Sequence, residues 1–200
     1  MSGLSAILLA AGESRRMGAA NKLLLTYRGQ PLIRQVAVQL LASGVREVIL
    51  VLGHQAEAVQ EALDDLALRF VRHPDFSRGM RSSIQKGAAA IDPSATGFLV
   101  CPGDMPLLRT AHHNALIELF TTEVSAGKTP IVRPFFRDLP GHPVLFHRRF
   151  LPELLQLREG EGCRPVIRQN ARHLLRWETP DPAYVVDVDT EAAYASLKHR

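Results

Sequence analysis

The chain has 200 residues, of which 46% are hydrophobic and 22% charged, and a formal net charge of +4 at pH 7. This composition is typical of a globular chain with one core, so we expect a single domain over residues 1–200. The charge is too small and too evenly spread for a nucleic-acid-binding surface, and no run approaches the ~20 apolar residues of a membrane span. The two cysteines, Cys101 and Cys163, form no Cys-x-x-Cys motif, which indicates free thiols in a reducing cytoplasm.

Short apolar runs alternate with amphipathic segments over the first two thirds of the chain. Continuous runs of Ile, Leu and Val, typical of strands buried on both faces, lie at residues 4–10, 47–53 and 97–103. Helical patterns lie at residues 31–42, 55–67, 82–90 and 111–120. Thr110 is a candidate N-cap for the last of these helices. Short links between strands and helices predict a parallel sheet that is covered on both faces.

The last third of the chain is less regular. Further strands are predicted at residues 130–136, 142–148, 175–179 and 184–189, and a final helix at 190–198. Turn residues separate the first two of these strands. The expected fold class is therefore α/β, a Rossmann-like unit with a mostly parallel sheet and a small antiparallel elaboration.

The loop that follows the first strand is rich in glycine and positive charge. It reads LAAGESRRMGAANK (9–22), which is neither a P-loop nor Gly-x-Gly-x-x-Gly. Its two glycines and the small alanines let the backbone approach a ligand, and its cations suit an anion; these residues are Ala10, Ala11, Gly12, Gly18, Arg15, Arg16 and Lys22. The alternative is a solvated basic turn. We favour a phosphate-binding loop.

Three aspartates follow other predicted strands, where ligands bind in open parallel sheets. Asp104 lies in the rigid turn of CPGDMP, and Asp187 and Asp189 alternate along one face of the last predicted strand. An acid that faces a polyphosphate is repelled unless a divalent cation lies between them. The alternatives are a turn aspartate for Asp104 and a position in the N-cap region of the final helix for Asp189. Together with the basic loop, the three acids predict a magnesium–nucleotide site.

Two other segments contain candidate binding residues. In GMRSSIQKG (79–87), Ser82 and Ser83 either cap a helix or contact a base. His142 lies in a turn before a strand, where a lone histidine is more often structural. Cys101, beside the candidate site, is expected to be a buried thiol at a strand end. No Ser-His-Asp order or zinc-ligand spacing is found.

Five segments in order, LAAGESRRMGAANKLL, GMRSSIQKG, CPGDMPLL, GHPVLF and DVDTEAAY, resemble the MobA-like nucleotidyltransferases, in particular the molybdenum cofactor cytidylyltransferase branch. The resemblance implies a three-layer α/β/α Rossmann-like fold and Mg²⁺-dependent nucleotidyl transfer. It assigns catalytic roles to Arg16, Lys22 and Asp104, and metal binding to Asp104, Asp187 and Asp189. The residues it assigns to the nucleotide are Leu9, Ala10, Ala11, Gly12, Arg16, Gly18, Lys22, Ser82, Ser83 and Asp104. His142 and the basic residues near it in the sequence, Arg133 and Arg137, are candidate contacts for the acceptor.

The resemblance also predicts the substrates. Ala11 and Asn21 stand where guanylyl members carry Gly and Asp, which favours CTP over GTP. The expected acceptor is the phosphate of a molybdopterin-type cofactor, and the expected partners include a molybdoenzyme or its maturation chaperone. The same fold with GTP or with another acceptor, such as a sugar phosphate, a methylerythritol-type phosphate or a small phospho-acid, is the nearest alternative. A non-catalytic module that delivers the cofactor is another.

Overall fold

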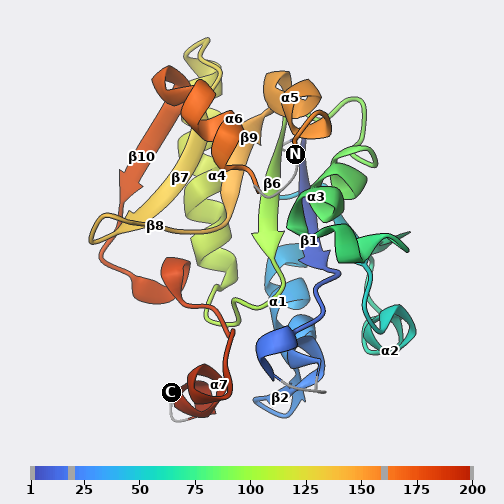
Figure 1. Ribbon diagram of the computed structural model, residues 1–200. Coiled ribbons are helices and arrows are strands. Elements are labelled where there is room, and N and C mark those ends of the chain that lie inside the picture. Colours follow the sequence, from blue (N-terminus) through green and yellow to red (C-terminus); the bar gives the residue numbers. More distant parts are fainter. Residues whose placement is uncertain (1–2, 18–20, 159–161, 199–200) are drawn as a thin grey trace.

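The computed structural model describes residues 3–17, 21–158 and 162–198 of the chain. A mixed sheet runs through the middle of the molecule in the strand order β10-β7-β9-β6-β1-β4-β5 (Figure 1). Its strands are β1 (Leu4–Ala10), β4 (Glu47–Leu52), β5 (Arg69–Arg72), β6 (Gly97–Pro102), β7 (Ile131–Phe136), β9 (Val144–His147) and β10 (Leu174–Glu178). The short strand β8 (Leu139–Pro140) pairs with β7, and β2 (Thr26–Tyr27) pairs with β3 (Gln30–Pro31) in a separate hairpin.

The direction of the strands places the carboxyl ends of three of them at one edge of the sheet. β1 pairs in parallel with β4 and with β6, while β9 is antiparallel to both of its neighbours, β6 and β7. The carboxyl ends of β1, β4 and β6 therefore lie at the same edge. The predicted α/β class, with a mostly parallel sheet and a small antiparallel part, is confirmed.

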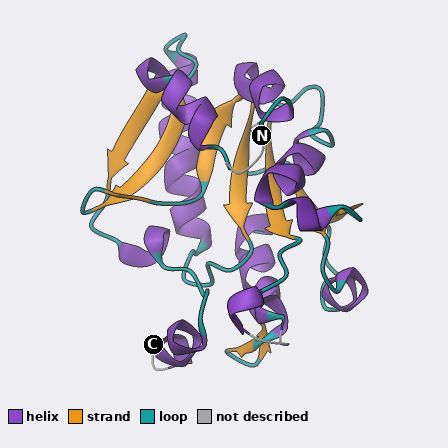
Figure 2. Ribbon diagram, in the orientation of Figure 1, coloured by secondary structure: helices purple, strands orange, loops and turns teal. Residues whose placement is uncertain are grey.

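Helices cover both faces of the sheet (Figure 2). On one face lie α1 (Leu32–Leu41) and α4 (Thr110–Ser125), and on the other lie α3 (Met80–Ala88), α5 (Leu151–Leu155) and α6 (Arg164–Gln169). The shorter α2 (Ala56–Glu61) follows β4, and α7 (Glu191–Lys198) ends the described chain. Because both faces are covered, the central strands carry apolar residues at nearly every position.

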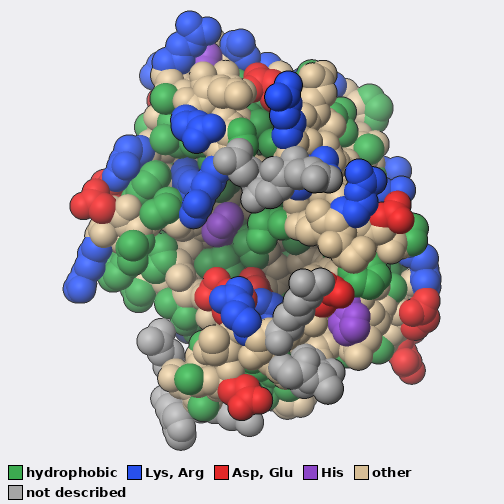
Figure 3. Space-filling view, in the orientation of Figure 1, with side chains coloured by type: hydrophobic (Ala, Val, Ile, Leu, Met, Phe, Trp, Pro, Cys, Tyr) green, Lys and Arg blue, Asp and Glu red, His purple; other side chains and the backbone are tan. Residues whose placement is uncertain are grey.

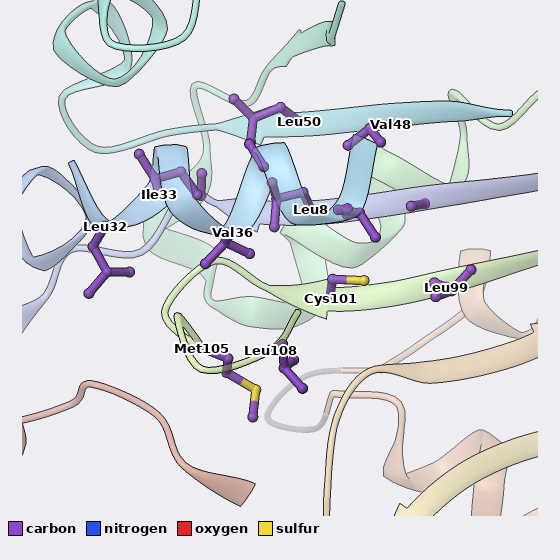
Figure 4. Close-up of a cluster of buried hydrophobic side chains, with 14 of the residues drawn as sticks. Leu8, Leu32, Ile33, Val36, Val48, Leu50, Leu99, Cys101, Met105 and Leu108 are labelled. Atoms are coloured by element: carbon purple, nitrogen blue, oxygen red, sulfur yellow. The ribbon is translucent and has the colours of Figure 1, made fainter. Parts of the chain in front are cut away.

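The two sides of the sheet have separate hydrophobic clusters. Figure 4 shows the cluster on the α1 side, where Leu8, Val36, Leu50 and Leu99 pack together and are fully buried. Cys101 belongs to the same cluster, and burial raises the pKa of its thiol. The prediction of a buried thiol at the strand end is confirmed, and both cysteines are free.

Three local predictions were wrong. Residues 184–189 do not form a strand: a 3-10 helix spans Pro182–Val185, and extended chain without strand pairing follows it. The segment has apolar residues like a strand because Tyr184 and Val188 are buried at the end of the sheet. The predicted helix over 55–67 is only α2, and Arg109 rather than Thr110 is the N-cap of α4.

The edge strand β5 and the β2–β3 hairpin were not predicted. β5 is only four residues long, with an exposed arginine at each end and two partly buried apolar residues between them. No helix in the described part of the chain has the length and hydrophobicity to cross a membrane.

Candidate active site at the carboxyl ends of β1 and β6

Two backbone hydrogen bonds bring three distant segments of the chain together. The N–H of Gly103 donates to the carbonyl oxygen of Leu9 at 3.0 Å, which joins the ends of β6 and β1. The N–H of Val188 donates to the carbonyl oxygen of Asp104, also at 3.0 Å. A Cβ atom on Gly103 would lie 2.6 Å from the Leu9 oxygen, so this close approach requires glycine. The carboxylates of the 101–106 loop and the 187–189 segment are thereby held at one place.

Lys22 lies at the centre of the resulting cluster. Its Nζ donates to Oδ2 of Asp104 and, at 2.5 Å, to Oδ1 of Asp189. Arg16 is largely exposed and donates to the other oxygen of Asp189 at 2.7 Å. Only 14% of the Lys22 side chain and 16% of the Asp104 side chain is exposed, so this ion pair is shielded from most of the solvent.

The protonation of these groups follows from their surroundings. Burial disfavours the charge of Lys22, but Asp104 and Asp189 outweigh it and raise the pKa of the ammonium group. Burial also opposes the charge of Asp189, yet the hydrogen bond and charge of Lys22, assisted by Arg16, lower the pKa of this carboxyl group. For Asp187, partial desolvation together with the charges of Asp189 and Asp104 outweighs the charge of Lys22 and raises the pKa.

The three aspartates also have the arrangement of a cation site. One carboxylate oxygen from each of Asp104, Asp187 and Asp189 lies within 4.8 Å of the other two. The second oxygen of Asp104, Oδ1, is buried and accepts no hydrogen bond from the described residues. Carboxylate oxygens are the ligands that Mg²⁺ prefers, and an unpartnered buried oxygen is the group that a cation would satisfy. These residues therefore fit a divalent metal ion.

The glycine-rich loop leaves room beside this cluster. A Cβ atom on Gly12 would meet no heavy atom within 4 Å, so packing does not explain the glycine at this position. Ala10 and Ala11 are buried and Leu9 is partly buried. Gly18 and the side chain of Arg15 lie outside the described residues. Of the loop's predicted cations, Lys22 and Arg16 thus reach the cluster.

Ser14 and Asn21 hold Lys22 in place, and the sequence did not reveal this role. The N–H of Lys22 donates to Oγ of Ser14 at 3.2 Å. Asn21 is the N-cap of the 3-10 helix Lys22–Leu24, and its Oδ1 accepts from the N–H of Leu23. An asparagine before a short helix is a typical N-cap, and aspartate caps equally well. The identity of residue 21 therefore carries little weight for the choice of base.

The two candidate serines lie inside α3 and do not cap it. The N-cap of α3 is Gly79, and no side chain caps the helix. The hydroxyl of Ser82 donates to the Gly79 carbonyl at 2.7 Å and lies 2.8 Å from Nε2 of His73. Burial lowers the pKa of His73. Because the Ser82 proton is directed to the Gly79 carbonyl, the Ser82 oxygen is left to accept from the His73 ring. The Ser82 hydroxyl is thus engaged within the protein, and Ser83 is buried beside it.

His142 lies beside the other end of the 184–188 segment. Its backbone N–H donates to the carbonyl oxygen of Tyr184 at 2.8 Å. Burial, reinforced by the charges of Arg133 and Arg164, lowers the pKa of the imidazole to about 4, so the ring is neutral at pH 7. Of the two arginines near His142 in the sequence, Arg133 is partly buried, whereas Arg137 is exposed in a turn.

One face of the molecule is hollowed. Figure 3 views the molecule from the side of α3, α5 and α6, and acidic and basic side chains lie against one another below the middle of this face. Above them the surface is hollowed, and basic side chains and a histidine lie beside the hollow. The face thus has a hollow with charged side chains along its lower side.

Comparisons with known proteins agree with this geometry. Residues 6–174 match the model of the MobA-like NTP transferase domain. The chain belongs to the MobA-like NTP transferase family. The resemblance predicted from the five sequence segments is confirmed, and the fold and family are those of nucleotidyltransferases.

Relatives of this family member carry different names. The chain is 31% identical to the nicotine blue oxidoreductase of Paenarthrobacter nicotinovorans, over 94% of this chain and 92% of that protein. It is 24% identical to the molybdenum cofactor cytidylyltransferase of Escherichia coli K12, over 100% and 98% of the two chains. The crystal structure of Rv0371c from Mycobacterium tuberculosis H37Rv superposes with a TM-score of 0.82 at 27% identity, covering 100% and 99% of the chains. A complex of the same protein with manganese superposes with a TM-score of 0.78.

Proposed function

We propose that this protein transfers CMP from CTP to the phosphate of a molybdopterin-type cofactor and releases pyrophosphate. The observation that supports the proposal most strongly is the position of Lys22 between Asp104 and Asp189, with Asp187 close by, at the carboxyl ends of β1 and β6. A positive side chain that lies among metal-binding carboxylates, next to an open glycine loop, suits a nucleoside triphosphate with its metal ion.

Little covalent chemistry is required of the protein in this reaction. The acceptor phosphate attacks the α-phosphorus of CTP in line, a P–O bond forms, and the bond to pyrophosphate breaks. The attacking phosphate is already ionised at neutral pH, so no general base is needed. The protein contributes orientation and stabilisation of the charge that develops on the leaving group.

Each residue of the cluster has a proposed role in this scheme. Lys22 and Arg16 would bind the β- and γ-phosphates and stabilise the pyrophosphate as it leaves. Asp104, with Asp187 and Asp189, would hold Mg²⁺, which when bound supplies a Lewis acid that neutralises phosphate charge. The manganese complex of the 27% identical Rv0371c protein supports a divalent cation in this family. Lys22 lies between the carboxylates of Asp104 and Asp189 and balances their charge.

The choice of CTP and of the acceptor is supported by the similarity to the molybdenum cofactor cytidylyltransferase, which extends over nearly the full length of both chains. Ala11 remains the sequence feature that favours CTP. We further expect the protein to act in the cytoplasm and to deliver its product to a molybdoenzyme or a maturation chaperone. Use of GTP, or of another phosphorylated acceptor, is the nearest alternative.

The test is pyrophosphate release in the presence of Mg²⁺, with CTP and GTP each supplied alone and together with candidate acceptors. We expect release that requires both CTP and the molybdopterin-type acceptor and that is lost in Asp104→Ala. Release with GTP only, or with a sugar phosphate only, would contradict the assigned substrates but not the transferase activity. Nucleotide binding without any release would indicate a delivery module instead.

An oxidoreductase activity is the second candidate function, because the chain is 31% identical to a nicotine blue oxidoreductase. The two described cysteines offer no redox pair, since burial raises the pKa of both thiols, that of Cys163 to about 12. A redox function would therefore need an external electron carrier, and the glycine-rich loop lacks the Gly-x-Gly-x-x-Gly motif of a dinucleotide site. Oxidation of NADH or NADPH by a dye acceptor, without pyrophosphate release from CTP, is the result that would favour this candidate.

A further inference from the structure

A second group of cations lies on the α3 side of the sheet, outside the Lys22 cluster. It consists of Arg133 on β7 and Arg164 at the first turn of α6, whose charges both act on His142. Arg133 lies two residues after Ile131, which belongs to the hydrophobic cluster on the α3 side, so both side chains face that way. Figure 1 shows α6 in front of this part of the sheet.

Neither arginine has an acidic partner among the described residues, which is unusual for Arg133 because its side chain is partly buried. Arg133 donates from Nε to the carbonyl oxygen of Gly141 at 3.1 Å, and no described carboxylate forms an ion pair with it or with Arg164. Burial, and then the charge of Arg164, lowers the pKa of Arg133. A desolvated guanidinium group without a counter-charge is costly to the folded state, and such groups are frequent at binding sites.

His142 adds a neutral hydrogen-bond donor to this group. Its Nδ1 is buried and has no hydrogen-bond partner among the described residues. The ring is only partly buried, so the nitrogen that solvent reaches is Nε2. Because the neighbouring arginines disfavour a charged imidazole, the neutral ring offers one N–H to a ligand. Two guanidinium groups and one neutral N–H make a donor set for an oxyanion.

The register of the sheet places this group at the same edge as the proposed metal-binding residues. Val144 pairs with Val100 in antiparallel β9 and β6, so the chain that precedes β9, with His142, and the chain that follows β6, with Asp104, leave the sheet at the same edge. An acceptor that has a reacting phosphate at one end and a second polar group at the other would contact both groups.

We propose that Arg133, Arg164 and His142 form an oxyanion-binding site for a second anionic group of the acceptor, distinct from the phosphate that attacks CTP. The proposal rests on the proposed function for the identity of the acceptor, but the site itself does not depend on that function. It makes these residues determinants of acceptor specificity and assigns them no part in the chemical step.

Inorganic phosphate is the probe for the site, and the ring ¹⁵N signals of His142, assigned with His142→Gln, are the readout. The protein is first saturated with CTP and Mg²⁺, so that phosphate binding at the glycine-rich loop is suppressed. We expect phosphate to shift the His142 signals in a saturable way, and Arg133→Gln and Arg164→Gln each to weaken this binding at least ~10-fold, the effect of one lost charge-assisted hydrogen bond. Arg164 is exposed, so its variant is expected to fold even if that of Arg133 does not.

Arg137→Gln is the matched control. It removes the same charge from the same hairpin, but Arg137 is exposed in the turn, with its Cζ 5.1 Å from the ring centroid of Phe136. This variant is expected to bind phosphate as the wild type does. Unchanged His142 signals on adding phosphate, or equal effects of Arg137→Gln and Arg164→Gln, would overturn the proposal.

Kinetics with the cofactor acceptor separate this proposal from the proposed function. Arg164→Gln should raise the KM for the acceptor at least ~10-fold and leave kcat and the KM for CTP unchanged. A protein that transfers CMP with an unaltered acceptor KM in this variant keeps its function and contradicts the oxyanion site. A protein that binds phosphate at His142 but releases no pyrophosphate with any acceptor keeps the site and contradicts the function.

Discussion

Replacing Lys22 by methionine should destabilise the protein in a manner that Mg²⁺ reverses. The three carboxylates lie within 4.8 Å of one another, and at an effective dielectric constant of ~20 two unit charges at that distance repel by about 3.5 kcal/mol. Solvent screens this repulsion, because Asp187 is exposed and 27% of the Asp189 side chain is exposed. We therefore expect the free energy of unfolding to fall by ~1–3 kcal/mol when the bridging ammonium group is removed.

Guanidinium chloride unfolding at neutral pH, with and without millimolar Mg²⁺, measures this effect. The cation should restore most of the lost stability of Lys22→Met because it replaces the ammonium group among the acids. The matched control is Arg34→Met, which breaks the Arg34–Asp65 pair with its two hydrogen bonds of 2.6 Å outside the site. This pair is exposed to solvent, so its loss should be smaller and should not respond to Mg²⁺. Wild-type stability of Lys22→Met, or an equal Mg²⁺ response in both variants, would refute the reasoning.

Three further predictions follow from single contacts. Asp104→Ala should lower turnover at least ~10²-fold without unfolding the protein, and a normal Mg²⁺-dependent rate would show the metal assignment to be wrong. Gly12→Ala should keep wild-type stability and raise the KM for CTP. Gly87→Ala should lower the free energy of unfolding by ~1–3 kcal/mol, since its Cβ would lie 2.4 Å from Cγ2 of Ile7. A larger loss of stability in Gly12→Ala than in Gly87→Ala would contradict both assignments. His113 is buried with neither ring nitrogen hydrogen-bonded to a described residue, so His113→Leu should raise the free energy of unfolding by ~1–3 kcal/mol.

The pH dependence of His113→Leu has a definite sign. Burial, and then the charge of His112, lowers the pKa of His113 from 6.5 to about 4 in the folded protein. The free energy of unfolding of the wild type is therefore unaffected by His113 above pH 6.5. It decreases as the pH falls toward 4, because the unfolded chain takes up the proton first. The advantage of the variant should grow by about 2 kcal/mol between pH 7 and pH 5 in urea titrations. An advantage that does not change with pH would contradict a neutral buried ring.

The central strands were predictable because their burial on both faces leaves a continuous apolar run, as in Leu4–Ala10 and Gly97–Pro102. The position of the site followed from the same strands, since Lys22 and Asp104 come after the ends of two of them. Residues 184–189 were predicted to form a strand because burial under the sheet edge produces the same apolar pattern as strand pairing. Asp187 and Asp189 reach the site through the hydrogen bond between Val188 and Asp104, which no local pattern indicates.

The functions of several polar side chains also depended on non-local contacts. The bridge from Lys22 to Asp189 joins residues 167 positions apart, and the pair of His73 and Ser82 depends on the packing of α3 against the loop after β5. Asn21 was interpreted as a mark of base choice, although its position before a short helix is typical of an N-cap. Sequence patterns thus located the acids and the basic loop, but only the fold assigned each polar group its partner.

The most direct test of the proposed function is mass spectrometry of the products formed from an equimolar mixture of CTP and GTP with Mg²⁺ and a molybdopterin-type acceptor. We predict one product, the acceptor with CMP attached through a pyrophosphate linkage, and one released pyrophosphate for each acceptor consumed. An acceptor that gains GMP, or one that remains unmodified while the nucleotides stay intact, would contradict the proposed function.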